Sequence, residues 1–282
     1  MNTPAEVAAA GQLACLLEVS APKPGNVSPD RHFHDTRYED FLASAVAIGP
    51  ALADAGLYPV GSTVRRAVIA TRQWTKSNTN LGIVLLVAPL ARAALQSGGT
   101  LRQRLARVLA STTVQDAAEV YAAIRHAHPG GLGEAAAEDV SESPSVTLRD
   151  AMGLAADRDA IAREYITDFA LTFDVGVPAL RRAREEGLPW IDASVDAYLR
   201  LLDSTADTHI ARKLGRTEAE AVSLRAREVL NAGGIRTEAG RQALAELDSA
   251  LRDPRNRRNP GTTADLTCAA IFVVILEGGW ER

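Results

Sequence analysis

Apolar residues recur along this chain at helical spacing, and no stretch of strand length alternates between apolar and polar residues. The run from 81 to 95 is almost continuously apolar and contains Pro89, which predicts a central helix that other helices cover and that bends at the proline. The run from 264 to 276 is equally apolar and predicts a second buried helix. The pattern therefore predicts an all-α fold, a single multi-helix globular bundle with a buried central helix.

Two capping boxes predict where individual helices begin. Thr36-Arg37-Tyr38-Glu39 precedes an apolar face that would run through Phe41-Leu42 to Val46. Thr217-Glu218-Ala219-Glu220 has the same pattern, and Gly233-Gly234 would end the helix that follows it. In each case a threonine hydroxyl would cap the first turn while the glutamate three residues later would bond back to it.

The helical pattern is interrupted from about residue 128 to 146, where glycine, serine and acidic residues replace the apolar positions. Helices of the same character resume at Thr147. The segment is therefore predicted to be a long loop inside one domain that spans residues 1–282, rather than a linker between two domains. Loops of this length in a compact domain are either mobile or functional.

Composition narrows the class of protein. The chain has 282 residues, of which 46% are hydrophobic, so it can build a sizeable core without metals or disulfides. A net charge of -4 argues against general binding to nucleic acid or to an anionic membrane, which requires an excess of Lys and Arg. Neither a signal peptide nor a membrane span is expected, because no apolar run has the required length or flanks.

The two cysteines carry information about the compartment. Cys15 and Cys268 each lie in an apolar helical run, and neither has the spacing of a zinc or redox motif. This usage is typical of buried thiols in a reducing environment, so we expect a cytoplasmic protein. The sequence leaves its oligomeric state open.

The segment Lys23-Pro24-Gly25-Asn26 places a cation on a rigid turn. Pro22 and Pro24 push the residues before them out of the α region, and Gly25 permits a backbone conformation that other residues resist. A rigid turn that carries a positive charge favours a ligand-binding site of which Lys23 forms part. An ordinary Pro-Gly turn with a solvated lysine is the alternative.

Two of the predicted helices begin with residues that are typical of anion-binding sites. Asn78-Thr79-Asn80 precedes the helix that begins at Leu81, and Asn259-Pro260-Gly261-Thr262 precedes the one that contains Asp265. Free backbone N–H groups at the positive end of a helix dipole would stabilise a phosphate. Ordinary capping by Asn78, Thr79 or Thr262 explains the same residues.

Two further segments are rich in charge. Asp203 and Asp207 would share one face of a helix, the arrangement that a Mg²⁺ site would use with substrate phosphates, and Arg212 follows them. A solvated polar face is an equal alternative. The basic run from 252 to 258 could contact a polyanion, but an exposed loop between helices explains it better.

Taken in order, these segments resemble the triphosphoribosyl-dephospho-coenzyme A synthase family, of which the chain would be a divergent member. The matching features are Lys23-Pro24-Gly25, Asp35 before Phe41-Leu42-Ala43-Ser44-Ala45, Asn78-Thr79 with Gly82, Gly133-Glu134-Ala135, Asp207 with Arg212 and Gly215, and Pro260-Gly261 with Ala264-Asp265-Leu266. The resemblance extends from about Glu18 to Leu276.

The resemblance implies an all-helical transferase that joins ATP to dephospho-CoA with loss of adenine. The product is the precursor of the prosthetic group of citrate lyase or malonate decarboxylase. The acceptor hydroxyl would attack the anomeric carbon of the ribose through a transition state like an oxocarbenium ion, and adenine would leave. Mg²⁺ and fixed cations would neutralise the triphosphate.

The resemblance also implies roles for individual residues. Those expected to bind substrate are Lys23, Gly25, Asn78, Thr79, Asn80, Glu134, Arg212 and Gly261. Those expected to bind Mg²⁺ or to act as the general base, with the division between them open, are Asp35, Asp207 and Asp265. The loop around Gly133 would close over the nucleotide.

The chain departs from the family pattern at one place. Asn80-Leu81 stand where the synthases usually have histidine and lysine, so an imidazole and an ammonium are missing from the expected phosphate end. Contacts of this kind contribute about 1.5 to 3 kcal/mol each, which corresponds to tenfold or more in affinity or rate. The alternatives are a subfamily enzyme that uses another phosphoribosyl donor or acceptor in one-carbon-carrier cofactor biosynthesis, and a non-catalytic nucleotide-binding helical protein.

Overall fold

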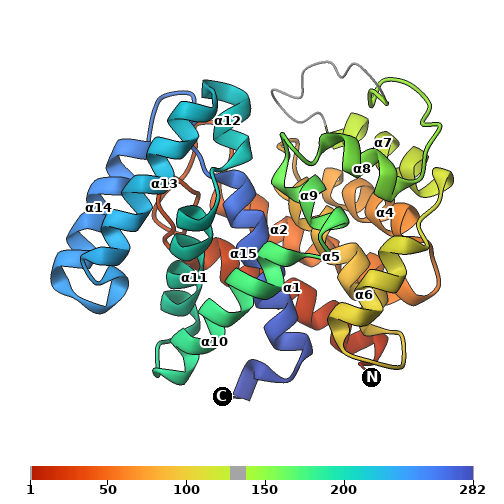
Figure 1. Ribbon diagram of the computed structural model, residues 1–282, viewed down its shortest axis with the longest axis horizontal. Coiled ribbons are helices and arrows are strands. Elements are labelled where there is room, and N and C mark those ends of the chain that lie inside the picture. The colour runs from red at the N-terminus through yellow and green to blue at the C-terminus, as the bar shows by residue number, and fades with distance from the viewer. Residues whose placement is uncertain (1, 128–137, 282) are drawn as a thin grey trace.

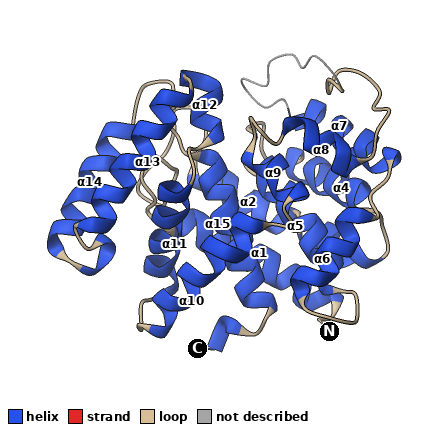
Figure 2. Ribbon diagram, in the orientation of Figure 1, coloured by secondary structure: helices blue, strands red, loops and turns tan. Residues whose placement is uncertain are grey.

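A computed structural model describes residues 2–127 and 138–281 of the chain. Over these ranges the protein consists of helices joined by turns and loops (Figures 1 and 2). The described residues form no β-sheet, and the one extended pairing among them is an isolated antiparallel bridge between Ser28 and Arg31. The prediction of an all-α fold is confirmed.

The α-helices, in chain order, are α1 (Pro4–Ser20), α2 (Tyr38–Ala47), α3 (Gly49–Ala53), α4 (Val60–Arg72), α5 (Leu81–Ala94), α6 (Leu101–Ala110), α7 (Val114–Ala127), α8 (Leu148–Ala155), α9 (Ala160–Ile166), α10 (Val177–Glu185), α11 (Trp190–Ser204), α12 (Thr208–Leu214), α13 (Arg216–Asn231), α14 (Glu238–Leu251) and α15 (Gly261–Leu276). Shorter turns of other helical types are η1 (Asp54–Gly56), η2 (Thr172–Gly176), η3 (Gly234–Arg236) and η4 (Gly279–Glu281).

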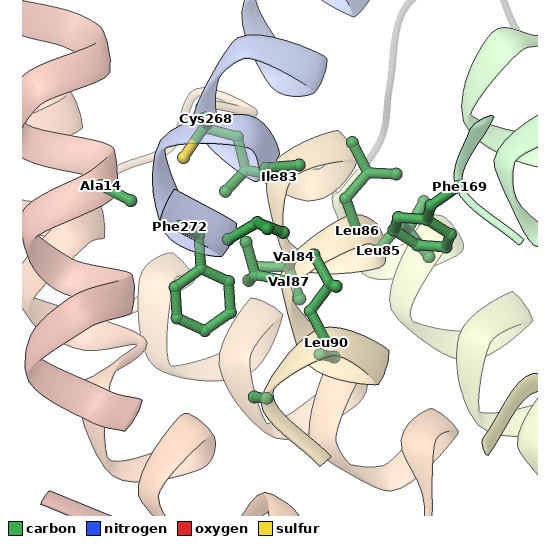
Figure 3. Close-up of a cluster of buried hydrophobic side chains, with 14 of the residues drawn as sticks. Ala14, Ile83, Val84, Leu85, Leu86, Val87, Leu90, Phe169, Cys268 and Phe272 are labelled. Atoms are coloured by element: carbon green, nitrogen blue, oxygen red, sulfur yellow. The ribbon is translucent and has the colours of Figure 1, made fainter. Parts of the chain in front are cut away.

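The core is built around α5 and α15, the two helices that the apolar runs predicted. Nearly every residue of both helices is buried, and they pack against each other and against α1. In Figure 3, Val87 and Leu90 of α5 lie toward the ring of Phe272 on α15. A helix that is apolar on all sides must be covered on all sides, which is why these two lie at the centre.

A second, smaller core lies between α11, α13 and α14, on the left of Figure 1. Helix α11 packs on α15 and α1 as well as on α13, so it joins the two cores. Its inward residues include Tyr198 and Leu202, both fully buried. Treating residues 1–282 as a single domain stays a prediction.

Both predicted capping boxes are displaced. Helix α2 begins at Tyr38, and the carboxylate of Asp40 accepts the N–H of Arg37 at 2.8 Å. Thr36 is not the cap, because its backbone and side chain bond to Phe33 and to its neighbour. Val46, expected on the inner face, is 61% exposed.

The second box fails for a similar reason. Helix α13 begins at Arg216, directly after Gly215, whose φ of 91° only glycine adopts readily. Thr217 therefore lies inside the helix instead of at its cap. The backbone turn at Gly215 had a stronger influence on the start of this helix than the threonine hydroxyl.

Asp203 and Asp207 do not share a helix face. Helix α11 ends at Ser204, and Asp207 begins a new helix as the cap of α12. Asp203 instead forms an ion pair with Arg227 of α13 at 2.7 Å.

Cys15 on α1 and Cys268 on α15 are free, buried thiols whose sulfur atoms lie 3.7 Å apart. The prediction of buried thiols is confirmed. None of the helices within 2–127 and 138–281 has the length and apolarity required to cross a membrane.

Candidate functional site

A cavity of about 360 Å³ lies where the two halves of the bundle meet. Residues of α1, α5 and α15 form its base, while α7, α8 and α9 form one wall and α12 the opposite one. Figure 1 shows α12 and the group α7–α9 on either side of α15. The cavity therefore collects segments that are far apart in the sequence.

The two walls differ in chemistry. The wall from α7 and α8 is mostly apolar and includes Val120, Ile124, Leu148 and Met152. The wall from α12 and the start of α15 is polar, with histidine, arginine, asparagine, threonine and aspartate side chains. A ligand with one apolar and one polar part would suit this arrangement.

The residues that the sequence singled out divide into three groups. Those that line the cavity are Asn78, Thr79, Asn80, Arg212, Gly261 and Asp265. Those that do not line it are Lys23, Gly25, Asp35 and Asp207. Glu134 and Gly133 lie outside the described residues, so the predicted closure of that loop over a nucleotide stays a prediction.

Asn78 and Asn80 are used in local structure. Asn78 Oδ1 accepts a hydrogen bond from the N–H of Leu81 at 3.2 Å, so capping, the alternative to phosphate binding, does occur here. Asn80 Nδ2 donates to Thr71 Oγ1 at 3.0 Å. Leu81 is buried, and the position of the family's lysine is therefore part of the cavity base and the core.

Lys23 points into the protein. Its side chain is 1% exposed, and Nζ lies 2.9 Å from the carboxylate of Glu18. Nζ also donates to the backbone carbonyls of Glu18 and Ala21 at the end of α1, which accept the N–H groups of Ala21 and Lys23 as well. Glu18 lines the cavity, whereas Lys23 does not. Lys23 therefore does not contact a ligand in the cavity directly. It binds the carboxylate of Glu18, which lines the cavity.

The turn after Lys23 is fixed by helices from the other end of the chain. The N–H of Gly25 donates to Asp248 of α14 at 2.8 Å, and Asn26 donates to the Tyr198 hydroxyl of α11 at 3.0 Å. Gly25 has φ of +74°, and a Cβ there would lie 2.9 Å from that of Leu251. Glycine is thus required by both backbone conformation and space.

Asp207 is buried and fully engaged. Its Oδ1 accepts the N–H groups of His209 and Ile210 at 2.9 and 3.0 Å. Its Oδ2 accepts the N–H and the hydroxyl of Thr263 at 2.8 and 2.7 Å. Burial raises the pKa of Asp207, although these hydrogen bonds oppose the rise. Asp207 therefore ties α12 to α15, and neither oxygen is left for a metal ion.

The three predicted magnesium ligands do not come together. The side chain of Asp35 is 62% exposed and lies beside His34, outside the cavity lining. Asp207 is saturated, and Asp265 alone faces the cavity. No group of three His, Cys, Asp or Glu residues is placed to hold a metal ion within the described ranges.

Asp265 lies one turn into α15, next to Gly82 of α5. A Cβ at position 82 would lie 2.0 Å from Asp265 Oδ2 and 2.8 Å from Ile161, so only glycine allows this approach. The side chain is partly exposed to the cavity, and no hydrogen bond or ion pair to Asp265 occurs in the described structure. Asp265 is the one cavity-lining carboxylate of the described chain without such a partner.

The charge around Asp265 is mostly negative. Burial raises its pKa well above the ordinary value, and the nearby carboxylates of Glu18, Asp207 and Asp159 raise it further, while Arg212 opposes them. The protein therefore favours the acid form of Asp265 more than water does for an exposed aspartate. A carboxyl group of this kind can donate a proton to a bound ligand.

Arg212 is the cation of the polar wall. It forms an ion pair with Asp159 Oδ2 at 3.2 Å, and Asp159 Oδ1 caps α9 through the N–H groups of Ile161 and Ala162. The Arg212 side chain remains 27% exposed. Its other donors are available to an anionic group in the cavity.

Among the polar cavity residues that were given no individual role from the sequence are Glu18, Asp159, His209 and Asn259. His209 Nδ1 lies 3.2 Å from the carbonyl oxygen of Asn259. Burial lowers the pKa of His209 to about 3, and the cations Lys213 and Arg212 lower it further, so the ring is neutral. The spacing of His209 and Arg212, three apart on one helix, was the available signal.

The contact between Gly82 and Asp265 gives a first testable prediction. Gly82→Ala is expected to lower the free energy of unfolding by about 1 to 3 kcal/mol, because the added methyl group overpacks against the carboxylate. Urea denaturation followed by circular dichroism measures this change. Gly153→Ala is the control, since its Cβ would meet only Ile166 at 3.6 Å, and it should gain up to about 1 kcal/mol. Equal stability of the two variants would contradict the close contact.

Comparison with known proteins agrees with this fold. The model of the family described as ATP:dephospho-CoA triphosphoribosyl transferase matches residues 4–282. A crystal structure from Archaeoglobus fulgidus, provisionally named triphosphoribosyl-dephospho-CoA synthase, superposes with a TM-score of 0.67 at 28% identity and covers 84% of this chain and 99% of its own.

Curated relatives align over a shorter stretch. A Pseudomonas fluorescens protein, provisionally named 2-(5''-triphosphoribosyl)-3'-dephosphocoenzyme-A synthase, is 36% identical over 39% of this chain and 38% of its own length. A Klebsiella pneumoniae protein with the same name, given without reservation, is 34% identical over 35% of each chain. The aligned part is thus less than two fifths of these relatives. The family match, however, spans nearly the whole sequence, and the chain belongs to the ATP:dephospho-CoA triphosphoribosyl transferase family.

Proposed function

We propose that the cavity is the active site of an enzyme that transfers the triphosphoribosyl group of ATP to a hydroxyl of dephospho-CoA and releases adenine. The observation that carries the proposal is the free carboxyl group of Asp265 in the cavity, within the electrostatic influence of Arg212. The names of the family and of its relatives supply the substrates. The apolar wall from α7 and α8 offers a surface for a purine ring.

The reaction exchanges two bonds at one carbon. The bond from the anomeric carbon to the adenine nitrogen breaks, and a bond to the acceptor oxygen forms. Adenine needs one proton as it leaves, and the acceptor hydroxyl gives up one, so the proton count balances. We assign both transfers to Asp265, which donates its proton to adenine and regains one from the acceptor. The raised pKa of this carboxyl group supports the first transfer.

The triphosphate would be held at the polar end of the cavity. Arg212 supplies one cation, and the N–H groups of Gly82 and Ile83 belong to the first turn of α5, where such groups lack a partner within the helix. Because the described residues form no three-carboxylate site, we propose that Mg²⁺ enters bound to the nucleotide. Glu18, held by Lys23, adds a fixed negative charge that would favour a cationic sugar in the transition state.

A second candidate is a subfamily enzyme that uses another phosphoribosyl donor or acceptor. The observation in its favour is the missing cationic pair: Asn80 is bonded to Thr71, and Leu81 belongs to the core. Either reaction would proceed in the cytoplasm under this proposal, because Cys15 and Cys268 are free thiols.

Release of adenine tests the proposed function. Purified protein with ATP, Mg²⁺ and dephospho-CoA is expected to release adenine and to form one equivalent of the triphosphoribosyl adduct, measured by chromatography and mass spectrometry. Omission of dephospho-CoA should abolish adenine release. Adenine formed with other hydroxyl acceptors, but not with dephospho-CoA, would favour the second candidate. Saturable ATP binding without adenine release under any of these conditions would contradict both reactions.

A further inference from the structure

His209 lines the cavity and has one ring nitrogen without a hydrogen-bond partner among the described residues. A carbonyl oxygen only accepts hydrogen bonds, so the contact with Asn259 requires that Nδ1 carry the proton of the neutral ring. The other nitrogen, Nε2, then has only its lone pair to offer. No hydrogen bond to Nε2 occurs among the described residues, and His209 lines the cavity. Nε2 is therefore a free acceptor.

Asn259 supplies a second free acceptor on the same wall. Its Oδ1 is buried and has no hydrogen-bond partner among the described residues. Asn259 also lines the cavity. A buried acceptor without a partner destabilises the empty site, so a ligand that donates to it relieves that cost on binding.

The position of this pair relative to Asp265 is set by α15. The imidazole of His209 packs against Gly261, where a Cβ would lie 2.6 Å from Nδ1. Gly261 and Asp265 are four residues apart on α15 and therefore lie on one face, about one helical turn from each other. The imidazole therefore contacts α15 about 6 Å along the helix axis from the backbone of Asp265.

We propose that His209 and Asn259 form an acceptor pair that binds the vicinal diol of the nucleotide ribose. A diol presents two adjacent O–H donors, which match two acceptors on neighbouring side chains. It also adjoins the anomeric carbon, so its place near Asp265 agrees with the reaction. This assignment rests on the proposed function, since it requires a ribonucleotide in the cavity.

The exocyclic amine of adenine is the other source of two donors in ATP. The diol is favoured because the acceptor pair belongs to the polar wall, next to Arg212, whereas the apolar wall across the cavity suits the purine. If the pair binds the diol, an analogue without the ribose hydroxyls should bind weakly; if it binds the amine, an analogue without the amine should bind weakly. ATP, 2',3'-dideoxy-ATP and inosine triphosphate are therefore the probes, the last of which keeps the diol and replaces the amine.

Isothermal titration at pH 8 with Mg²⁺ measures the three affinities in the wild type and in Asn259→Leu, which removes Oδ1 at similar volume. We expect wild-type protein to bind ATP roughly 10- to 100-fold more tightly than the dideoxy analogue, because each neutral hydrogen bond is worth about three- to tenfold. In Asn259→Leu this ratio should fall about three- to tenfold. The ratio of ATP to inosine triphosphate should stay unchanged.

His209→Phe provides the second variant, because it keeps a ring and removes Nε2. It should reduce the same ratio by a similar factor, with unchanged circular dichroism. An unchanged dideoxy ratio in both variants, with ATP still bound, would overturn the acceptor pair but leave the proposed function intact. A change confined to the inosine ratio would assign the pair to the amine and overturn the diol. Absence of ATP binding to the wild type would overturn the proposed function and the acceptor pair together.

Discussion

Lys23→Gln is expected to lower the free energy of unfolding by about 3 to 5 kcal/mol, the usual cost of breaking a buried ion pair from one side. Glu18 would be left as a buried charge without its partner, since the ammonium 2.9 Å away is lost. Glutamine retains donors for the carbonyls at the end of α1, so the change removes mainly the charge. Urea denaturation at neutral pH measures the effect. Lys76→Gln, at an exposed lysine, should stay within about 0.5 kcal/mol of wild type.

A double variant separates the charge from the shape of the side chain. In Glu18→Gln with Lys23→Gln both charges are absent, so it should be more stable than Lys23→Gln alone. The coupling energy from the double-mutant cycle gives the strength of the pair. If Lys23→Gln and Lys76→Gln have the same stability, Lys23 does not form a buried ion pair with Glu18. Lys23 would then be free to bind phosphate, as the sequence suggested.

The fold was predictable because its strongest signal is local. The apolar runs of α5 and α15 predicted their burial, and that burial requires other helices to cover them. The first residue of each helix was harder to predict, because several groups within a few residues can cap the same helix. At α2 the carboxylate of Asp40 caps the chain in place of Thr36, and at α13 the positive φ of Gly215 sets the start.

The site was only partly predictable, because a motif does not say which way a side chain points. Lys23 was correctly identified as belonging to a rigid corner, but the same corner could expose the ammonium or bury it. The deciding partner, Glu18, is an acid on the last turn of an apolar helix. A buried acid there requires a cation nearby, and this was the signal that the sequence offered for the inward orientation.

Asp207 and Asp265 illustrate what depends on distant contacts. Both are aspartates at the start of a helix, and the sequence could not divide roles between them. The structure separates them through Thr263, whose N–H and hydroxyl saturate Asp207. Asp265 lies against Gly82, which has no side chain with which to bond. The difference arises from the packing of α15 against α12 and α5, which no local pattern encodes.

Asp265→Asn is expected to reduce the rate of adenine release by roughly 100- to 10,000-fold, the usual range for loss of a general acid or base. Asparagine has nearly the same shape, so the dissociation constant of ATP should change by less than tenfold. Single-turnover adenine release and isothermal titration measure the two quantities. Asp192→Asn, on α11 outside the cavity lining, is the matched control and should release adenine at the wild-type rate.

Stability distinguishes a catalytic carboxyl group from a structural one. A pKa that is raised on folding means that ionising Asp265 weakens the folded state, so its carboxyl group stabilises the protein only at low pH and this contribution is lost as pH rises. Asparagine cannot ionise, and Asp265→Asn should therefore be at least as stable as wild type at neutral pH. Asp207→Asn should be less stable, because its amide nitrogen cannot accept the N–H of Thr263, and the bonds from His209 and Ile210 no longer end on a charged carboxylate. Sites under functional selection commonly give up stability for activity, so a catalytic Asp265 should not be needed for stability. An Asp265→Asn protein that is less stable than wild type and still releases adenine would show that Asp265 serves the fold instead of the reaction.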